Sequence, residues 1–262
     1  MTVWHNGHLV EDVSISAFDP VFSGMGAFET LLAVKGRAFA WARHRERLVQ
    51  SLQLLSIPVP DLSEMALIIG DLLERNRLAE AEARVRITIS GQTSKVTQVI
   101  VTVQPYERSV DSVRLATSIT PVNADSPLRQ VKSLSYAENW LFHQEAESLE
   151  LDDVLIANTS GSLAEASMSN VIIRHQGILK TPPLSAGCLP GVTRALLMEM
   201  ESAIIEEEIP MSFLAEAEEV WLCNSLRRLQ FATELDGRRL AKPSGHFHDL
   251  SEALETLIYR EP

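Results

Sequence analysis

The chain has 262 residues, of which 45% are hydrophobic and 22% are charged, as is typical of a folded globular protein. Its net charge of −12 opposes binding to nucleic acid or to an anionic membrane, so neither is expected as a partner. Two cysteines, no basic-apolar signal at the start and no long apolar run favour a cytoplasmic protein without a disulfide framework.

The first half of the chain predicts hairpins and helices in alternation. Asn6-Gly7 and Lys35-Gly36 each separate two strand-like segments, which is typical of tight hairpin turns. Leucines on one face predict a helix after the second hairpin, and Asp61 or Ser63 is expected to cap the next helix. The expected strands span 2–4, 8–10, 28–34, 37–41, 83–90 and 98–104, and the helices span 42–55 and 61–78.

A polar, irregular stretch over residues 105–112 predicts a linker between two halves. We therefore expect an N-terminal α/β domain, residues 1–110, and a C-terminal domain, residues 113–262, that carries Lys132. Neither half has the strand, Gly-rich turn and helix of a dinucleotide-binding fold, so the fold class is α+β. In the second half, strands are expected over 113–118, 154–158, 170–174, 177–181 and 220–224, and helices over 133–149, 191–209 and 250–259.

Three features of the second half have the chemistry of a pyridoxal 5'-phosphate (PLP) site. Lys132 offers an amine for a Schiff base with the cofactor's aldehyde, and Glu165, in a small-residue loop, offers a carboxylate to keep the pyridine nitrogen protonated. Gly191, Val192 and Thr193 begin a helix, where free N–H groups and a hydroxyl suit a phosphate dianion. Each feature alone also fits an ordinary structural role, but the three together favour PLP.

Other residues are candidates to complete this site. Tyr136 follows Lys132 by one expected helical turn, so its phenol should lie on the same face, near the cofactor's ring oxygen. Asn224 and Ser225 end a buried strand and could donate hydrogen bonds to the phosphate. Arg47 could supply positive charge, although taken alone it is expected to be a solvated helix residue.

Five motifs occur in one order along the chain: G-x-G-x-F-E-T-L at 24–31, H-x-x-R-L at 44–48, K-x-x-x-Y-x-x-N at 132–139, E-x-x-x-S-N at 165–170 and L-P-G-x-T-R at 189–194. Together they resemble the class IV aminotransferases, which are the fold type IV PLP enzymes. The resemblance implies a two-domain fold like that of D-amino acid aminotransferase, with the active site between the domains and near a homodimer interface. It also implies that Arg47 contacts the phosphate.

The family includes branched-chain and D-amino acid aminotransferases as well as 4-amino-4-deoxychorismate lyase, an enzyme of folate biosynthesis. The short chain and the sequence Cys223-Asn224-Ser225-Leu226 resemble the lyase, which releases 4-aminobenzoate and pyruvate. A transaminase of branched-chain, D- or other amino acids is the alternative, and a non-catalytic PLP-fold protein is a third. Arg86, and Arg227 or Arg228, are candidate clamps for substrate carboxylates, although a surface role fits each of them too.

Three positions depart from the family's pattern. Met25 stands where many members carry an acid, Ala166 replaces a frequent glycine, and Phe231-Ala232 stands where Pro-Val is common. These positions leave the cofactor anchors intact but bear on the identity of the substrate, because the nearby loops shape the pocket. No metal is expected, because the cluster His246-Phe247-His248-Asp249 has no further ligands at suitable spacing and reads as an exposed helix start.

Overall fold

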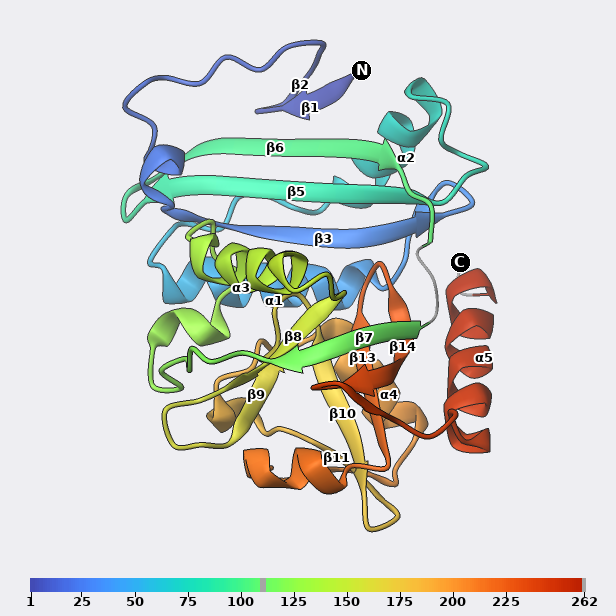
Figure 1. The fold of residues 1–262 in the computed structure, drawn as a ribbon. Coiled ribbons are helices and arrows are strands. Elements are labelled where there is room, and N and C mark those ends of the chain that lie inside the picture. The colour runs from blue at the N-terminus through green and yellow to red at the C-terminus, as the bar shows by residue number, and fades with distance from the viewer. Residues whose placement is uncertain (109–111, 261–262) are drawn as a thin grey trace. The chain divides into compact units, whose positions relative to one another are not determined.

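The computed structural model describes residues 1–108 and 112–260, and these form two compact units. Unit 1 contains residues 1–108, 131–136 and 257–260, and unit 2 contains residues 112–130 and 137–256. Each unit combines a sheet with helices (Figure 1), so the predicted α+β class is confirmed. No helix within the described residues has the length and apolar character needed to span a bilayer.

Unit 1 contains, within its described residues, the strands β1 (Val3–His5), β2 (His8–Val10), β3 (Gly26–Val34), β4 (Arg37–Ala38), β5 (Ala83–Gln92) and β6 (Lys95–Pro105), and the helices α1 (Trp41–Leu54) and α2 (Met65–Arg75). The sheet order is β2-β1-β6-β5-β3-β4, and β6, β5 and β3 run side by side (Figure 1). Odd-numbered residues such as Leu31, Ile87 and Val101 form one buried cluster with α1 and α2. Strand alternation therefore places even-numbered residues, including Phe28 and Arg86, on the opposite face.

Residues 131–136 pair with the edge of β3 and do not begin a helix. Phe28 N donates a hydrogen bond to Lys132 O at 2.9 Å, and Leu134 N donates to Gly26 O at 2.9 Å. These bonds use backbone groups that a helix would need, so α3 (Ala137–Ser148) begins only after this segment. The expectation that Tyr136 lies one helical turn beyond Lys132 is wrong, and the segment groups with unit 1 whereas the sequence assigned it to the C-terminal domain.

Unit 2 contains, within its described residues, the strands β7 (Ser112–Thr117), β8 (Asp153–Ala157), β9 (Leu163–Ala166), β10 (Asn170–His175), β11 (Ile178–Thr181), β12 (Ile204–Glu206), β13 (Glu219–Asn224), β14 (Arg228–Leu235) and β15 (Arg238–Arg239). Its helices are α3, α4 (Val192–Met200) and α5 (Gly245–Arg260), the last four residues of which group with unit 1. The sheet order is β12-β11-β10-β13-β14-β7-β8-β9, with β15 on β14. Strand β7 pairs in parallel with both β14 and β8, so strands from distant parts of the sequence meet there.

Most expected elements are present, and their ends differ where sheet pairing competes with helix formation. The hairpins at Asn6-Gly7 and Lys35-Gly36 are confirmed. The helix expected over 191–209 ends at Met200, because the following residues form β12 and pair with β11. The predicted linker includes residues 109–111, which lie outside the described residues.

Gly26 permits the close packing of residues 131–136 on β3, and its substitution tests that contact. A Cβ at Gly26 would lie 2.3 Å from Ile89 O and 2.6 Å from Leu134 Cδ1. Gly26→Ala is therefore expected to lower the free energy of unfolding by about 1–3 kcal/mol, the usual cost of overpacking. At Gly245 an added Cβ meets nothing within 4 Å, so Gly245→Ala is the matched control. Equal stability of the two variants in urea unfolding would contradict the tight contact.

Candidate active site

The ring of Phe28 brings together three of the predicted site residues in unit 1. The Arg86 guanidinium carbon lies 3.9 Å from the ring centroid, and Lys132 Nζ lies 4.7 Å from it. The Tyr136 ring packs edge-on against Phe28 with centroids 5.2 Å apart, and Lys132 Nζ lies 5.5 Å from the Tyr136 ring. Cation–π attraction favours both cations at these rings. The Lys132 amine thus has two aromatic neighbours, and Phe28 is a residue whose role the sequence did not reveal.

Arg47 is buried in unit 1 and forms a bidentate ion pair with Glu29 across α1 and β3. Arg47 Nε lies 2.8 Å from Glu29 Oε1, and Arg47 Nη2 lies 2.7 Å from Glu29 Oε2. His44 Nδ1 lies 2.7 Å from the same carboxylate. Burial raises the pKa of Glu29, but the charge and hydrogen bonds of Arg47 lower it to about 2. Arg47 is only 7% exposed, so the solvated alternative is wrong and its guanidinium has a fixed orientation.

Glu165 lies in strand β9 of unit 2 and is buried, whereas the sequence placed it in a loop. Its Oε1 accepts a hydrogen bond from Arg129 Nη2, and its Oε2 accepts one from Leu189 N at 2.8 Å. Arg129 also donates to Gly187 O at 2.7 Å, so three segments converge on this arginine and carboxylate. Sequence reasoning missed Arg129, because a single arginine before the Lys132 motif carries no pattern. The two bonds fix the carboxylate's orientation.

Helix α4 begins at the glycine of the L-P-G motif, directly beside Asn170. Gly191 is the N-cap, and no side chain caps the helix there. A Cβ on Gly191 would lie 1.8 Å from Asn170 Oδ1, so this approach needs glycine. Asn170 Nδ2 in turn donates to Leu189 O at 2.9 Å. The first turn, with Val192 and the buried Thr193, combines the positive end of a helix with a hydroxyl, which suits an anion.

Asn224 shapes the turn that follows β13. Its Oδ1 accepts a hydrogen bond from Arg227 N at 2.7 Å. Its Nδ2 donates to Ser169 Oγ at 3.0 Å and to Met168 O at 3.2 Å. Both amide hydrogens are therefore used within the protein, so the Asn224 side chain supports the turn and does not serve as a phosphate donor. Ser225, in the same turn, stays a predicted phosphate-binding residue.

Two arginines, Arg227 at the end of this turn and Arg228 directly after it, have different surroundings. Arg228 is buried, and its Nη1 lies 3.2 Å from Glu255 Oε1, so it serves an internal ion pair and does not fit the predicted carboxylate clamp. Arg227 is partly exposed, and its Nη1 lies 3.6 Å from Oδ2 of Asp153, a fully buried residue. Within unit 2, Ser169 and Asn170 link Glu165, the α4 start and the Asn224 turn.

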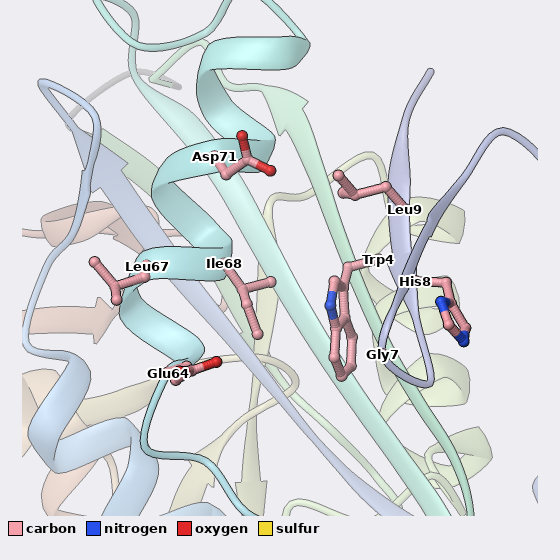
Figure 2. Close-up of a pocket in the computed structure, with 8 residues that line it drawn as sticks. All are labelled: Trp4, Gly7, His8, Leu9, Glu64, Leu67, Ile68 and Asp71. Carbon is pink, nitrogen blue, oxygen red and sulfur yellow. The ribbon is translucent and has the colours of Figure 1, made fainter.

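A separate open groove of about 390 Å³ lies in unit 1 between α2 and the β1–β2 hairpin. Figure 2 shows Trp4 and Ile68 pointing toward one another across it. The groove has no lysine and contains none of the predicted site residues, so it lacks the amine that PLP chemistry needs. Its lining residues are Trp4, Gly7, His8, Leu9, Glu64, Leu67, Ile68 and Asp71.

The groups of the two units fit the needs of PLP. Lys132 offers an amine held beside aromatic rings, and Glu165 offers an oriented, buried carboxylate. The uncapped start of α4, with Gly191 and Thr193, has the charge and donors that a phosphate requires. The chemistry of these groups, taken within each unit, suits covalent binding of an aldehyde cofactor and proton transfer by one amine.

Comparison with known proteins identifies the family. Residues 26–235 match the family described as amino-transferase class IV. A putative branched-chain-amino-acid aminotransferase of Methanocaldococcus jannaschii is 27% identical, over 91% of this chain and 89% of the relative. An aminodeoxychorismate lyase of Bacillus subtilis is also 27% identical, over 99% of this chain and 94% of the relative. The PLP-bound structure of a hypothetical aminotransferase from Mycobacterium tuberculosis superposes with a TM-score of 0.87 at 26% identity, covering 98% of this chain and 99% of that one.

The chain belongs to the class IV aminotransferase family, since the match covers most of its length. The fold type IV architecture and the cofactor of this family, PLP, are thereby confirmed as predicted. The protein is a PLP-dependent enzyme of this family. Both lyase and transaminase names occur among relatives of similar identity, so membership of the family does not decide between the two reactions.

The Glu29–Arg47 pair links the stability of unit 1 to pH. The pKa of Glu29 is about 2 in the fold and 4.5 in its unperturbed form, so its stabilising effect is complete above about pH 4.5 and is lost as the pH falls toward 2. A shift of this size corresponds to about 3 kcal/mol. Glu29→Gln should lower the melting temperature of the apoprotein at neutral pH and flatten its dependence on pH.

Glu46→Gln, an exposed change on α1 beside Arg47, is the control and should keep the wild-type dependence on pH. Thermal unfolding followed by circular dichroism from about pH 7 to pH 3 provides the measurement. Parallel curves for wild type and Glu29→Gln would show that this carboxylate is not the titrating group.

Proposed function

We propose that the protein is a PLP-dependent lyase that converts 4-amino-4-deoxychorismate into 4-aminobenzoate and pyruvate. The supporting observation is that Lys132 and Arg86 lie around one aromatic ring, Phe28. This substrate carries its amine and a carboxylate at opposite ends of a six-membered ring. A cation near the reactive amine suits such a substrate, because Arg86 can bind the ring carboxylate while the substrate amine reacts at the cofactor.

Each predicted site residue has a role in this proposal. Lys132 binds the cofactor covalently through Nζ, and Glu165 binds the pyridine nitrogen. The Tyr136 hydroxyl donates a hydrogen bond to the phenolic oxygen attached to the cofactor's ring. Arg86 binds a carboxylate of the substrate. The phosphate is bound by the helix start at Gly191, Val192 and Thr193, by Ser225 and the backbone of the Asn224 turn, and by Arg47.

When bound, PLP supplies a ring that accepts electrons from the substrate. Lys132 Nζ accepts a proton from the ring carbon that bears the amine and returns a proton to the departing pyruvate. The bond between the ring and the pyruvate oxygen breaks, and the ring becomes aromatic. The Phe28 and Tyr136 rings both lie near Nζ, and their attraction for the lysine cation favours a defined position of the amine.

A transaminase of branched-chain, D- or other amino acids is the second candidate, and the similarity to the Methanocaldococcus jannaschii protein favours it. Its reaction uses the same Lys132, with the proton moved between the substrate carbon and the cofactor. A non-catalytic PLP-binding protein fits poorly, because Lys132 and Glu165 are both present. We further propose a homodimer, since Phe18 is 94% exposed and Phe22 is 69% exposed. A cytoplasmic location is proposed because the two cysteines form no disulfide.

The first test of this proposal concerns the covalent anchor. Purified protein should be yellow, and borohydride reduction should fix the cofactor on Lys132, as located by peptide mass spectrometry. Lys132→Ala should lose this labelling and all turnover, because the variant has no amine at that position. Lys95→Ala, an exposed change in the same unit, should keep both. Labelling of another lysine would contradict the assignment.

The second test separates the lyase from the transaminase. With 4-amino-4-deoxychorismate and no keto acid, the protein should release 4-aminobenzoate and pyruvate over many turnovers, since the reaction restores the cofactor in each cycle. Arg86→Gln should raise KM for this substrate roughly tenfold or more, as a charge-assisted bond contributes about 1.5–3 kcal/mol. Turnover that requires both an amino acid and a keto acid would reject the lyase and establish the transaminase.

A further inference from the structure

Asp153 is a buried carboxylate that the cofactor chemistry does not use. It begins β8 and is fully buried. Its Oδ1 accepts hydrogen bonds from Ser167 N and Val154 N, both at 2.9 Å. Within the described part of the chain, its Oδ2 has no hydrogen-bond partner, and Arg227 Nη1 at 3.6 Å is the cation nearest to it. Burial raises the pKa of Asp153, which shows how incompletely its charge is compensated.

The position of Arg227 is fixed at both ends. Its backbone N–H is held by Asn224 Oδ1 at 2.7 Å, inside the turn that carries Ser225. Its side chain reaches Asp153 and is 26% exposed. A long side chain that is fixed at both ends cannot easily change conformation to bind a substrate, so this geometry suits a structural role better than substrate binding.

Asp153 and Asn224 hold the same short segment, residues 167–169, from two directions. Asp153 binds Ser167 N, and the Asn224 side chain binds Met168 O and Ser169 Oγ. This segment joins Glu165 to Asn170, the residue that contacts Gly191 at the start of α4. The interactions thus form a closed ring, from Asp153 through Arg227 and Asn224 to residues 167–169 and back to Asp153.

We propose that Asp153 and Arg227 are a pair of positioning residues that hold the Asn224–Arg227 turn against residues 167–169, and so place Ser225 and the α4 start for the cofactor's phosphate. Arg227 then acts through the turn and is not a substrate clamp. The inference rests on the proposed function only in naming PLP as the ligand. The ring of contacts itself lies wholly within unit 2.

The consequence of breaking the pair follows from its burial. Removal of Arg227 leaves the Asp153 charge buried without a cation, and the turn then moves or the carboxylate takes up a proton. Asp153→Asn removes the charge but keeps the size and an oxygen that can accept from Ser167 N. Loss of either residue removes the same Asp153–Arg227 ion pair, so the two single changes and the double change should have similar effects on phosphate binding.

The test measures PLP affinity of the apoprotein by absorbance titration, together with KM for the amine substrate. Arg227→Gln, Asp153→Asn and the double variant should each raise the PLP dissociation constant by about tenfold, the effect typical of losing a residue that orients a ligand group. Arg227→Lys should restore part of the affinity. Exposed neighbours supply the matched controls: Asp152→Asn and Arg239→Gln should bind PLP like wild type.

Two results would overturn the inference. The first is a raised substrate KM in Arg227→Gln with unchanged PLP affinity, which would make Arg227 a clamp for the substrate. The second is a loss of PLP affinity in the double variant that equals the sum of the losses in the two single variants. A wild-type apoprotein that does not bind PLP would instead contradict the proposed function. In that case urea unfolding of the four proteins decides the matter, because the pair predicts non-additive stability changes and independent residues predict additive ones.

Discussion

Three buried carboxylates are each paired with an arginine, and these pairs are the constraint on which the proposed site depends. Glu29 binds Arg47, Glu165 binds Arg129, and Asp153 faces Arg227. Burial of an unpaired charge costs several kcal/mol, so each acid dictates where its arginine lies. Each pair also joins elements far apart in the sequence: α1 to β3, the segment before Lys132 to β9, and the turn after β13 to β8. The proposed cofactor groups are carried by these joined elements.

The sequence predicted the elements and the chemically active residues better than it predicted their partners. Lys132, Glu165 and the Gly191 helix start stand out because their types and order are specific to one chemistry. Arg129 and Asp153 could not be found, because their roles arise from tertiary contacts with Glu165 and Arg227 that no local pattern records. Local reasoning also failed where backbone pairing decides the outcome. The residues around Lys132 have helical neighbours in sequence, yet β3 uses their backbone groups.

One face of the unit 1 sheet packs against helices to form the core, and the other face carries predicted site residues. Odd-numbered residues of β3, β5 and β6 pack on α1 and α2, and they form the core. The even-numbered residues Phe28 and Arg86 meet Lys132 on the other face. Glu29 also faces α1, but unlike its apolar neighbours on that face it is charged and binds Arg47. Arg86 lies outside the core cluster, whereas Phe28 and Leu32 on its face are themselves buried, so only some positions of this face can change without opening the core.

This division explains why one family can hold both a lyase and a transaminase. The cofactor side is built from backbone groups and buried ion pairs, such as Leu189 N with Glu165, and these tolerate little change. In the proposed function, Arg86 binds the substrate from the even-numbered face of the sheet, outside the buried core cluster. Both candidate reactions move a proton with the same lysine. The side chains around that amine, Arg86 and Phe28 among them, are therefore where we expect a lyase and a transaminase to differ.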